Sequence, residues 1–162
     1  MLSSKLIQLI EDRWDPITTR ILTDIRADPR LRHACSLPQS DLRDRTQEIL
    51  RHFGHWLTAS RPDELARHFE RIGGLRFEEE APLAEVVLCY ILVKDRIVDF
   101  VRSQGIGPTA MEVYAEEELE HSAGCFFDST IYHVVRGYEE AMNEARRIRT
   151  EPKPKHAAAA AR

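Results

Sequence analysis

One group of histidine and glutamate residues has the spacing of a metal site. Glu48, His52 and His55 follow one another at steps of four and three, which on a helix places the three side chains on one side. A zinc or iron ion would require them to converge to about 2 Å from the metal. The competing interpretation is a polar helix flank beside the apolar residues Phe53 and Trp56. We favour the flank, because closely spaced histidines alone do not define a site.

A second group of potential ligands lies further along the chain. Glu118, His121, Cys125 and Asp128 form one helical line, and Glu118 and His121 have the Glu-x-x-His spacing of di-iron helix bundles. Such a bundle needs a second Glu-x-x-His pair and two further glutamates on facing helices, and the sequence has none at matching positions. We therefore predict no cofactor, and keep a metal or haem centre as the alternative.

The cysteines give little support to nucleophilic catalysis. Cys89 has Glu85 one helical turn away, and Cys125 has Asp128 nearby. A neighbouring negative charge raises the pKa of a thiol and does not activate it. The chain also has no glycine-rich phosphate loop and no Gly-x-Ser-x-Gly motif. The residues therefore predict a protein that is not an enzyme.

A line of polar residues on an apolar helix is the best candidate for a binding site. The segment 82–103 is the most apolar part of the chain, and its polar residues recur at steps of three and four. Because buried charges have to be paired, Arg71 or Arg76 just upstream could reach Glu85. A structural ion-pair network and a polar-edged pocket between helices both fit. The pocket candidates are Arg71, Glu85, Cys89, Arg96 and Asp99.

Composition restricts the classes of partner. The 162 residues contain 23 Lys and Arg against 27 Asp and Glu, so the net charge is −4 and indicates no surface for nucleic acid or an anionic membrane. The longest apolar run, residues 86–93, is far shorter than the roughly 20 residues of a membrane span. Three cysteines without a Cys-x-x-Cys pair favour reduced thiols and a cytoplasmic protein.

Helical periodicity places these residues on elements. The first apolar stripe steps by three or four residues from Leu6 to Ile25, and Pro16 either kinks one helix or begins a second with Asp15 as its cap. A following helix begins near Ser36 or Ser40, where Ser36-Leu37-Pro38-Gln39 resembles a capping box.

The second half of the chain has the same periodicity. A helix from about residue 60 is expected to stop at Gly73–Gly74, with residues 75–81 as a connector. The helix 82–103 is expected to be central, and a capping box at Thr109 begins a pattern that continues to about residue 149, with a break near Gly124 or Gly137. The sequence thus predicts an all-α domain of five or six helices over residues 1–150, in bundle or globin-like packing, and a disordered tail over 151–162.

Short segments spread over roughly residues 5 to 145 resemble one known family. They are Ile10-Glu11-Asp12-Arg13-Trp14, Leu37-Pro38-Gln39-Ser40-Asp41-Leu42, Ile49-Leu50-Arg51, Trp56-Leu57, Arg71-Ile72-Gly73-Gly74-Leu75-Arg76-Phe77, Ala81-Pro82-Leu83-Ala84-Glu85-Val86-Val87, Lys94-Asp95, Phe126-Phe127-Asp128-Ser129-Thr130 and Gly137-Tyr138. Together they resemble the RsbRD-type N-terminal sensory domain of the RsbT co-antagonist family, which acts in bacterial stress-response regulation.

The resemblance implies a helical input module that acts through a ligand or a protein partner. It supplies no catalytic residues, and Glu85 and Arg71 match its recurring positions. Helical input domains commonly signal as packed pairs, so we expect a homodimer through the long final helix. The interface candidates are Phe126, Phe127, Val134, Tyr138 and Met142.

Related stress-complex proteins have globin-like input domains without haem, which makes a haem-binding version the alternative function. In that alternative a haem or metal would be held by histidines with nearby carboxylates, from the set His52, His55, His68, His121 and His133.

Overall fold

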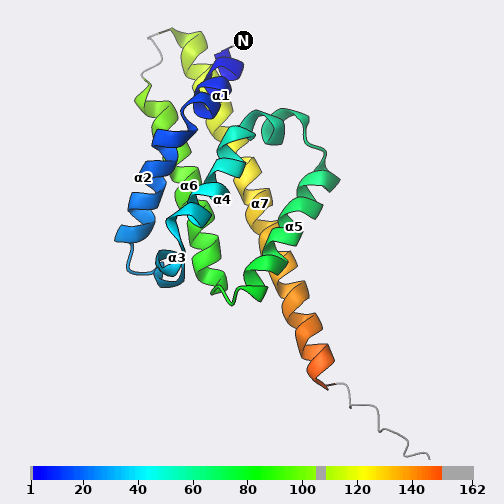
Figure 1. Cartoon of the computed structure of the whole chain (residues 1–162). Helices are drawn as coiled ribbons and strands as arrows, with labels where there is room; N and C mark the ends of the chain where they lie inside the picture. The colour runs from blue at the N-terminus through cyan, green and yellow to red at the C-terminus, as the bar shows by residue number, and fades with distance from the viewer. Residues whose placement is uncertain (1, 105–108, 151–162) are drawn as a thin grey trace, which may run out of the picture.

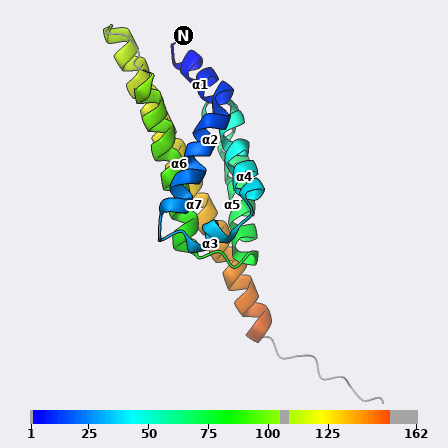
Figure 2. The ribbon, with the colours of Figure 1, turned by 60° about the vertical axis from the view of Figure 1, so that its left-hand side comes forward.

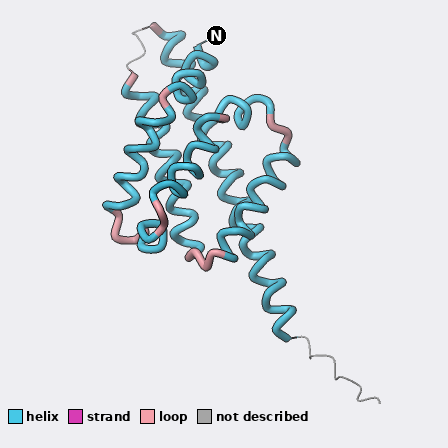
Figure 3. Tube along the Cα trace, in the orientation of Figure 1, coloured by secondary structure: helices cyan, strands magenta, loops and turns pink. Residues whose placement is uncertain are grey.

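Helices account for nearly all of the chain that the structure describes, residues 2–104 and 109–150. The structure is a computed structural model, and it contains no strand within these residues (Figure 3). The elements are α1 (Leu2–Asp12), α2 (Trp14–Ala27), α3 (Arg32–Ser36), α4 (Gln39–Arg51), the π-helical turn His55–Ala59, α5 (Pro62–Glu78), α6 (Leu83–Ser103) and α7 (Ala110–Thr150). The predicted all-α class is confirmed, with more helices than the five or six expected.

The longest helix, α7, crosses the whole molecule and packs along α5 and α6 (Figure 1). α2 lies between α4 and α6, and α1 packs across one end of the molecule against α4 and α7. The last turns of α7, drawn in orange, extend beyond the other helices in the views of Figure 1 and Figure 2.

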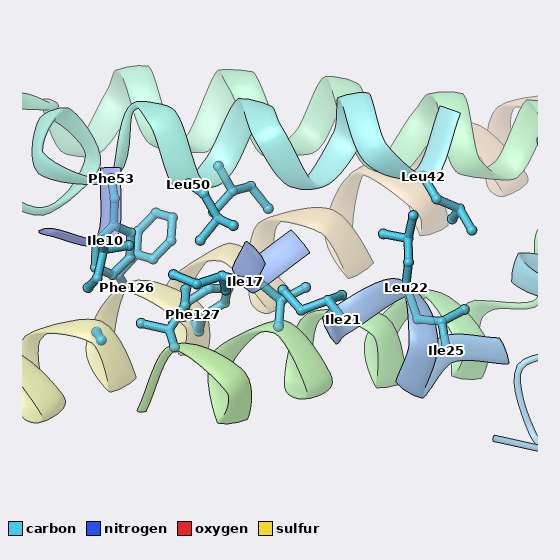
Figure 4. Packing of buried hydrophobic residues seen from close by; sticks show 14 of the residues in the cluster. Ile10, Ile17, Ile21, Leu22, Ile25, Leu42, Leu50, Phe53, Phe126 and Phe127 are labelled. Carbon is cyan, nitrogen blue, oxygen red and sulfur yellow. The ribbon is translucent and has the colours of Figure 1, made fainter. Parts of the chain in front are cut away.

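The core joins the apolar stripes of α1, α2, α4, α5, α6 and α7. Ile10, Ile21, Phe53 and Phe127 are each 0% exposed, and Figure 4 shows these side chains meeting in the interior. The rings of Phe53 and Phe126 meet edge to face, with centroids 6.0 Å apart. Each side chain of this size stabilises the fold by about 1.5–3 kcal/mol when fully buried.

The first apolar stripe is divided between two helices. α1 ends at Asp12 and α2 begins at Trp14, with Arg13 between them at φ −102° and ψ 20°. Pro16 lies in the first turn of α2, where a missing backbone N–H removes no intrahelical hydrogen bond. The alternative of a second helix is therefore confirmed, although the break falls at Arg13 and not at Asp15.

The two capping boxes have different outcomes. Ser36 ends α3 and its hydroxyl donates to the carbonyl of His33, while α4 begins at Gln39 after Pro38, so the predicted box at Ser36 is wrong. Proline fixes φ and lacks a donor, which suits the position immediately before a helix. At α7, the Glu112 carboxylate accepts hydrogen bonds from the backbone N–H and the hydroxyl of Thr109, which confirms a capping interaction there.

The prediction that Gly73–Gly74 ends a helix is wrong. α5 continues through both glycines to Glu78, so most of the expected connector is helical. A Cβ atom built on Gly73 would lie 2.0 Å from the carbonyl oxygen of Val134 on α7. The glycine is required because the two helix backbones touch, and not because the helix stops.

The long final helix is continuous, contrary to the predicted break. α7 runs from Ala110 to Thr150 through Gly124 and Gly137. Gly137 serves the same contact as Gly73, because its Cβ would lie 2.0 Å from the carbonyl oxygen of Glu70. The expected central position of α6 is only partly realised, since four of its residues are fully buried while Val87, Ile91 and Val98 are half-buried.

The sequence also predicts a disordered tail and no membrane-spanning segment. The predicted tail, 151–162, lies outside the described residues. Among the helices that the structure describes, none is long and apolar enough to cross a membrane.

Candidate functional site

A cavity of about 90 Å³ lies where α3, α4, α5 and α6 meet, and we refer to it as the α4–α6 cavity. Most of its wall is apolar: α2 contributes Ile25, α4 contributes Leu42 and Ile49, and α6 contributes Val86 and Val93. These residues belong to the stripes that pack the helices, so folding itself forms the wall. An apolar cavity of about 150 Å³ holds benzene, and the α4–α6 cavity is therefore suited to a molecule of a few heavy atoms.

Glu85 ties α3 to α6 beside this cavity. Its Oε2 accepts hydrogen bonds from the backbone N–H groups of His33, at 2.9 Å, and Ala34, at 3.3 Å. α3 has no side-chain cap of its own, so Glu85 satisfies N–H groups that a helix start leaves without partners. The first turn of α6 thus positions a carboxylate that serves another helix.

Two arginines from different helices share one carboxylate at the cavity. Nη2 of Arg45, on α4, donates to both oxygens of Glu79 at 3.1 Å, and Nη1 of Arg76, on α5, donates to the same oxygens at 2.7 and 2.8 Å. The side chain of Arg76 is only 14% exposed. Burial would raise the pKa of Glu79, but the hydrogen bonds and charges of Arg76 and Arg45 outweigh burial and hold that pKa below its ordinary value.

Two titratable groups in the cavity wall are neutral at physiological pH. Burial raises the pKa of the Cys89 thiol to about 11, and the negative charge of Glu85 adds to this effect. Burial likewise raises the pKa of Tyr90 to about 12. A thiol that holds its proton is a weak nucleophile.

His33 brings an unsatisfied polar atom to the same region. Its side chain lines the α4–α6 cavity, and its Nε2 is buried without a hydrogen-bond partner among the described residues. Leaving a polar atom in this state costs about 1–3 kcal/mol. The cost would be removed by a partner from outside the chain.

The structure brings two of the predicted pocket residues together. Glu85 and Cys89 both line the α4–α6 cavity. Arg96 and Asp99 lie elsewhere on α6, where Arg96 pairs with Asp24 of α2 and with Asp99 and borders an open surface hollow. Arg71 is exposed on α5 and does not line the cavity.

Sequence reasoning missed Arg45, His33 and Tyr90. The position of Arg45 has a detectable signal, because it lies three residues after Leu42 and four before Ile49, on the buried face of α4. The position of His33 has no such signal. His33 and Glu85 are 52 residues apart in the chain and meet only because α3 packs on α6.

The potential metal ligands are not assembled into a site. α4 ends at Arg51, so Glu48, His52 and His55 do not share one helix, and His55 instead contacts Glu64 at 3.0 Å. Nδ1 of His52 lies 3.1 Å from the carbonyl oxygen of Glu48.

The second group lies on the exposed surface of α7. There Glu118, His121 and Asp128 are exposed, and His121 lies 3.6 Å from the sulfur of Cys125. Over residues 2–104 and 109–150, no group of three or more His, Cys, Asp or Glu side chains could hold a metal ion.

The other two histidines considered for haem each contact a glutamate. His133 lies 2.9 Å from Glu70, and His68 lies 3.3 Å from Glu48. Burial lowers the pKa of His68 below its ordinary value. Both imidazoles thus have intramolecular partners in the helix packing.

Most of the predicted dimer-interface residues lie inside the chain. Phe126, Phe127 and Val134 are at most 5% exposed and belong to the core, which leaves them little surface for a partner. Tyr138 and Met142 are half-buried, and the Tyr138 hydroxyl donates to the carbonyl oxygen of Ala81.

The chain was compared with known proteins in three ways. The search of curated proteins and the search of solved structures gave no match. A family model matches residues 15–151, which include α3 to α7 and all of α2 except its first residue, and it describes the N-terminal domain of the RsbT co-antagonist protein rsbRD. The expected resemblance is confirmed, and this chain belongs to the RsbRD N-terminal domain family, a family of regulatory sensory domains of the stress response.

Proposed function

We propose that this domain is a non-enzymatic regulatory module that responds to a small molecule in the α4–α6 cavity. The observation that supports the proposal is the composition of that cavity. An apolar wall surrounds a few charged groups, Glu85, Arg45 and Arg76, that come from three different helices. Small-molecule sites have this composition.

The position of the cavity gives a bound molecule a way to affect the fold. α3 is held through Glu85, and α4 is joined to the end of α5 through the Arg45–Glu79 ion pair. A ligand that contacts these groups would bind one arrangement of the helices better than another. Such a difference in affinity shifts the populations of the two arrangements.

We also propose that the protein is a cytoplasmic homodimer that signals through protein contacts, with the projecting end of α7 as the contact surface. Met142, Ala145 and Ile148 recur there at steps of three, and Ile148 is 63% exposed. Met142 and Ala145 are half-buried, so the line becomes exposed towards Ile148. An apolar line on a helix that extends beyond its own body is typical of a helix-packing surface.

The cavity proposal can be tested with a variant that fills the cavity. Cys89→Leu adds two heavy atoms to the wall, and Cys125→Leu makes the same change at an exposed position. Native mass spectrometry and a thermal-shift screen of small molecules would be applied to both variants and to the wild type. We expect bound small molecules or thermal shifts in the wild type and Cys125→Leu, and their loss in Cys89→Leu. The same binding in all three proteins would contradict the proposal.

A further inference from the structure

We infer that the α4–α6 cavity binds a small carboxylate with a short apolar tail, and that Arg45 and Arg76 hold its carboxylate group. The inference rests on the proposed function, because it names the chemical class of the molecule for the same cavity. It follows from the size of the cavity, the unused donors of the two arginines and the state of Glu85.

The apolar wall limits the tail of the ligand. Ile25, Leu42, Ile49, Val86 and Val93 offer no hydrogen bonds through their side chains, so this part of the cavity favours hydrocarbon. The volume of about 90 Å³ is smaller than a benzene-sized cavity. A straight or branched chain of about three or four carbons fits such a space.

The two guanidinium groups have N–H donors that do not bind Glu79. Each has five N–H groups, yet Glu79 binds only Nη2 of Arg45 and Nη1 of Arg76. Among the described residues, the hydrogen bonds of the two arginines to Glu79 use neither Nε nor the second Nη atom, and none of these four atoms is a buried atom without a partner. On Arg76 the remaining Nε and Nη2 share one edge of the planar guanidinium, which matches a carboxylate with two parallel hydrogen bonds. On Arg45 the remaining Nε and Nη1 lie on different edges, so each can donate a single hydrogen bond. A second carboxylate is the group that best fits the free edge of Arg76, with Arg45 as an additional donor.

Charge also favours an anion at this position. Arg45 and Arg76 share the single negative charge of Glu79, so these three groups together carry one positive charge, and Glu85 supplies one negative charge elsewhere in the wall. The carboxylate of Glu85 already has partners, because its Oε2 accepts hydrogen bonds from two backbone N–H groups of α3. An amine bound to Glu85 is the competing arrangement, and isobutylamine tests it.

The test is a titration of the full chain, followed by NMR, with four small molecules. Isobutyrate is the expected ligand. Isobutyramide and isobutylamine have the same branched four-carbon skeleton with a neutral or a cationic head, and inorganic phosphate has the charge without the tail. A lost charge-assisted hydrogen-bond pair corresponds to about tenfold or more in affinity. We expect isobutyrate to bind at least about tenfold more tightly than each of the other three.

Three variants locate the carboxylate. Arg45→Gln and Arg76→Gln should each weaken isobutyrate by about tenfold. Arg71→Gln removes an exposed arginine from the same helix as Arg76 and should leave the affinity unchanged. Circular dichroism of each variant verifies the fold, and if one variant does not fold, the other provides the result.

The outcomes separate this inference from the proposed function. Equal or tighter binding of isobutyramide, isobutylamine or phosphate would overturn the carboxylate assignment, and so would an unchanged affinity in both Arg45→Gln and Arg76→Gln. If one of the neutral or cationic molecules bound and Cys89→Leu abolished that binding, the cavity would still be a ligand site. Failure of every molecule, in this titration and in the thermal-shift screen, would overturn both proposals.

Discussion

Cys89 is a residue whose protonation should affect the stability of the fold. Its thiol has a pKa of about 11 in the fold, against 9.0 in the absence of burial and of Glu85. Between these pH values the unfolded chain has lost the proton and the folded chain still holds it. The free energy of unfolding therefore decreases as the pH rises above 9, by about 2 kcal/mol at pH 11 from this group alone.

Urea unfolding of the wild type and Cys89→Ala between pH 8 and pH 11 measures this contribution. Deprotonation of Tyr90 also destabilises the fold at high pH, since the pKa of Tyr90 is raised to about 12. The pH dependence of the wild-type unfolding free energy alone therefore does not identify the thiol. The difference between the two curves does, and it should decrease towards high pH. Cys125→Ala, at an exposed cysteine, should keep the wild-type slope. Parallel curves for the wild type and Cys89→Ala would show that Cys89 ionises normally in the fold.

α5 and α7 pack so closely that their backbones touch at two glycines. Gly73 faces the backbone of Val134, and Gly137 faces the backbone of Glu70, each at a distance that leaves no room for a Cβ atom. The two glycines thus lie on opposite sides of one contact. Backbone atoms in helices cannot rotate away as flexible side chains do, so the contact depends on both glycines.

Alanine substitutions at two glycines should have opposite effects on stability. In Gly73→Ala the new methyl group would meet the Val134 carbonyl, and we expect a loss of at least about 1–3 kcal/mol in the free energy of unfolding. In Gly124→Ala the new methyl group would meet no heavy atom within 4 Å. Alanine is there expected to stabilise α7 by about 0.5–1 kcal/mol, because it restricts the unfolded chain and favours the helix. Urea unfolding measures both changes, and equal effects would contradict the close contact.

The same glycines show what the sequence can and cannot predict at the level of elements. Periodicity located the long helices, because each buries one apolar face and this face repeats every turn. The sequence does not show which helix lies opposite a glycine, so at Gly73–Gly74 it favours the commoner role of glycine, at helix ends. Likewise, Glu85 and Cys89 were found from their own helix, whereas His33 depends on how α3 packs against α6.

At the scale of the whole molecule, the helices divide into a packed body and a projecting segment. Phe126, Phe127 and Val134 lie in the body. Tyr138 also packs there, and its hydroxyl donates a hydrogen bond to the carbonyl oxygen of Ala81. The ring of Tyr138 packs edge to face against Phe77, with centroids 5.4 Å apart. Tyr138→Glu would therefore lower the stability of the monomer itself, and it cannot serve to test a dimer.

The end of α7 projects from the rest of the molecule (Figure 1). Ile148 lies in the last turn of this helix, which ends at Thr150, and is 63% exposed, so it offers a cleaner test of the proposed homodimer. We expect the wild type to be a dimer by light scattering coupled to size-exclusion chromatography, and Ile148→Glu to be a monomer with an unchanged circular dichroism spectrum. A charge placed between two packed apolar faces is costly to bury, whereas on a free helix it remains in water. Asn143→Glu puts the same charge on a neighbouring exposed position and should leave the dimer intact. If Ile148→Glu eluted with the mass of the wild-type dimer, the contact surface would have to lie on another part of the molecule.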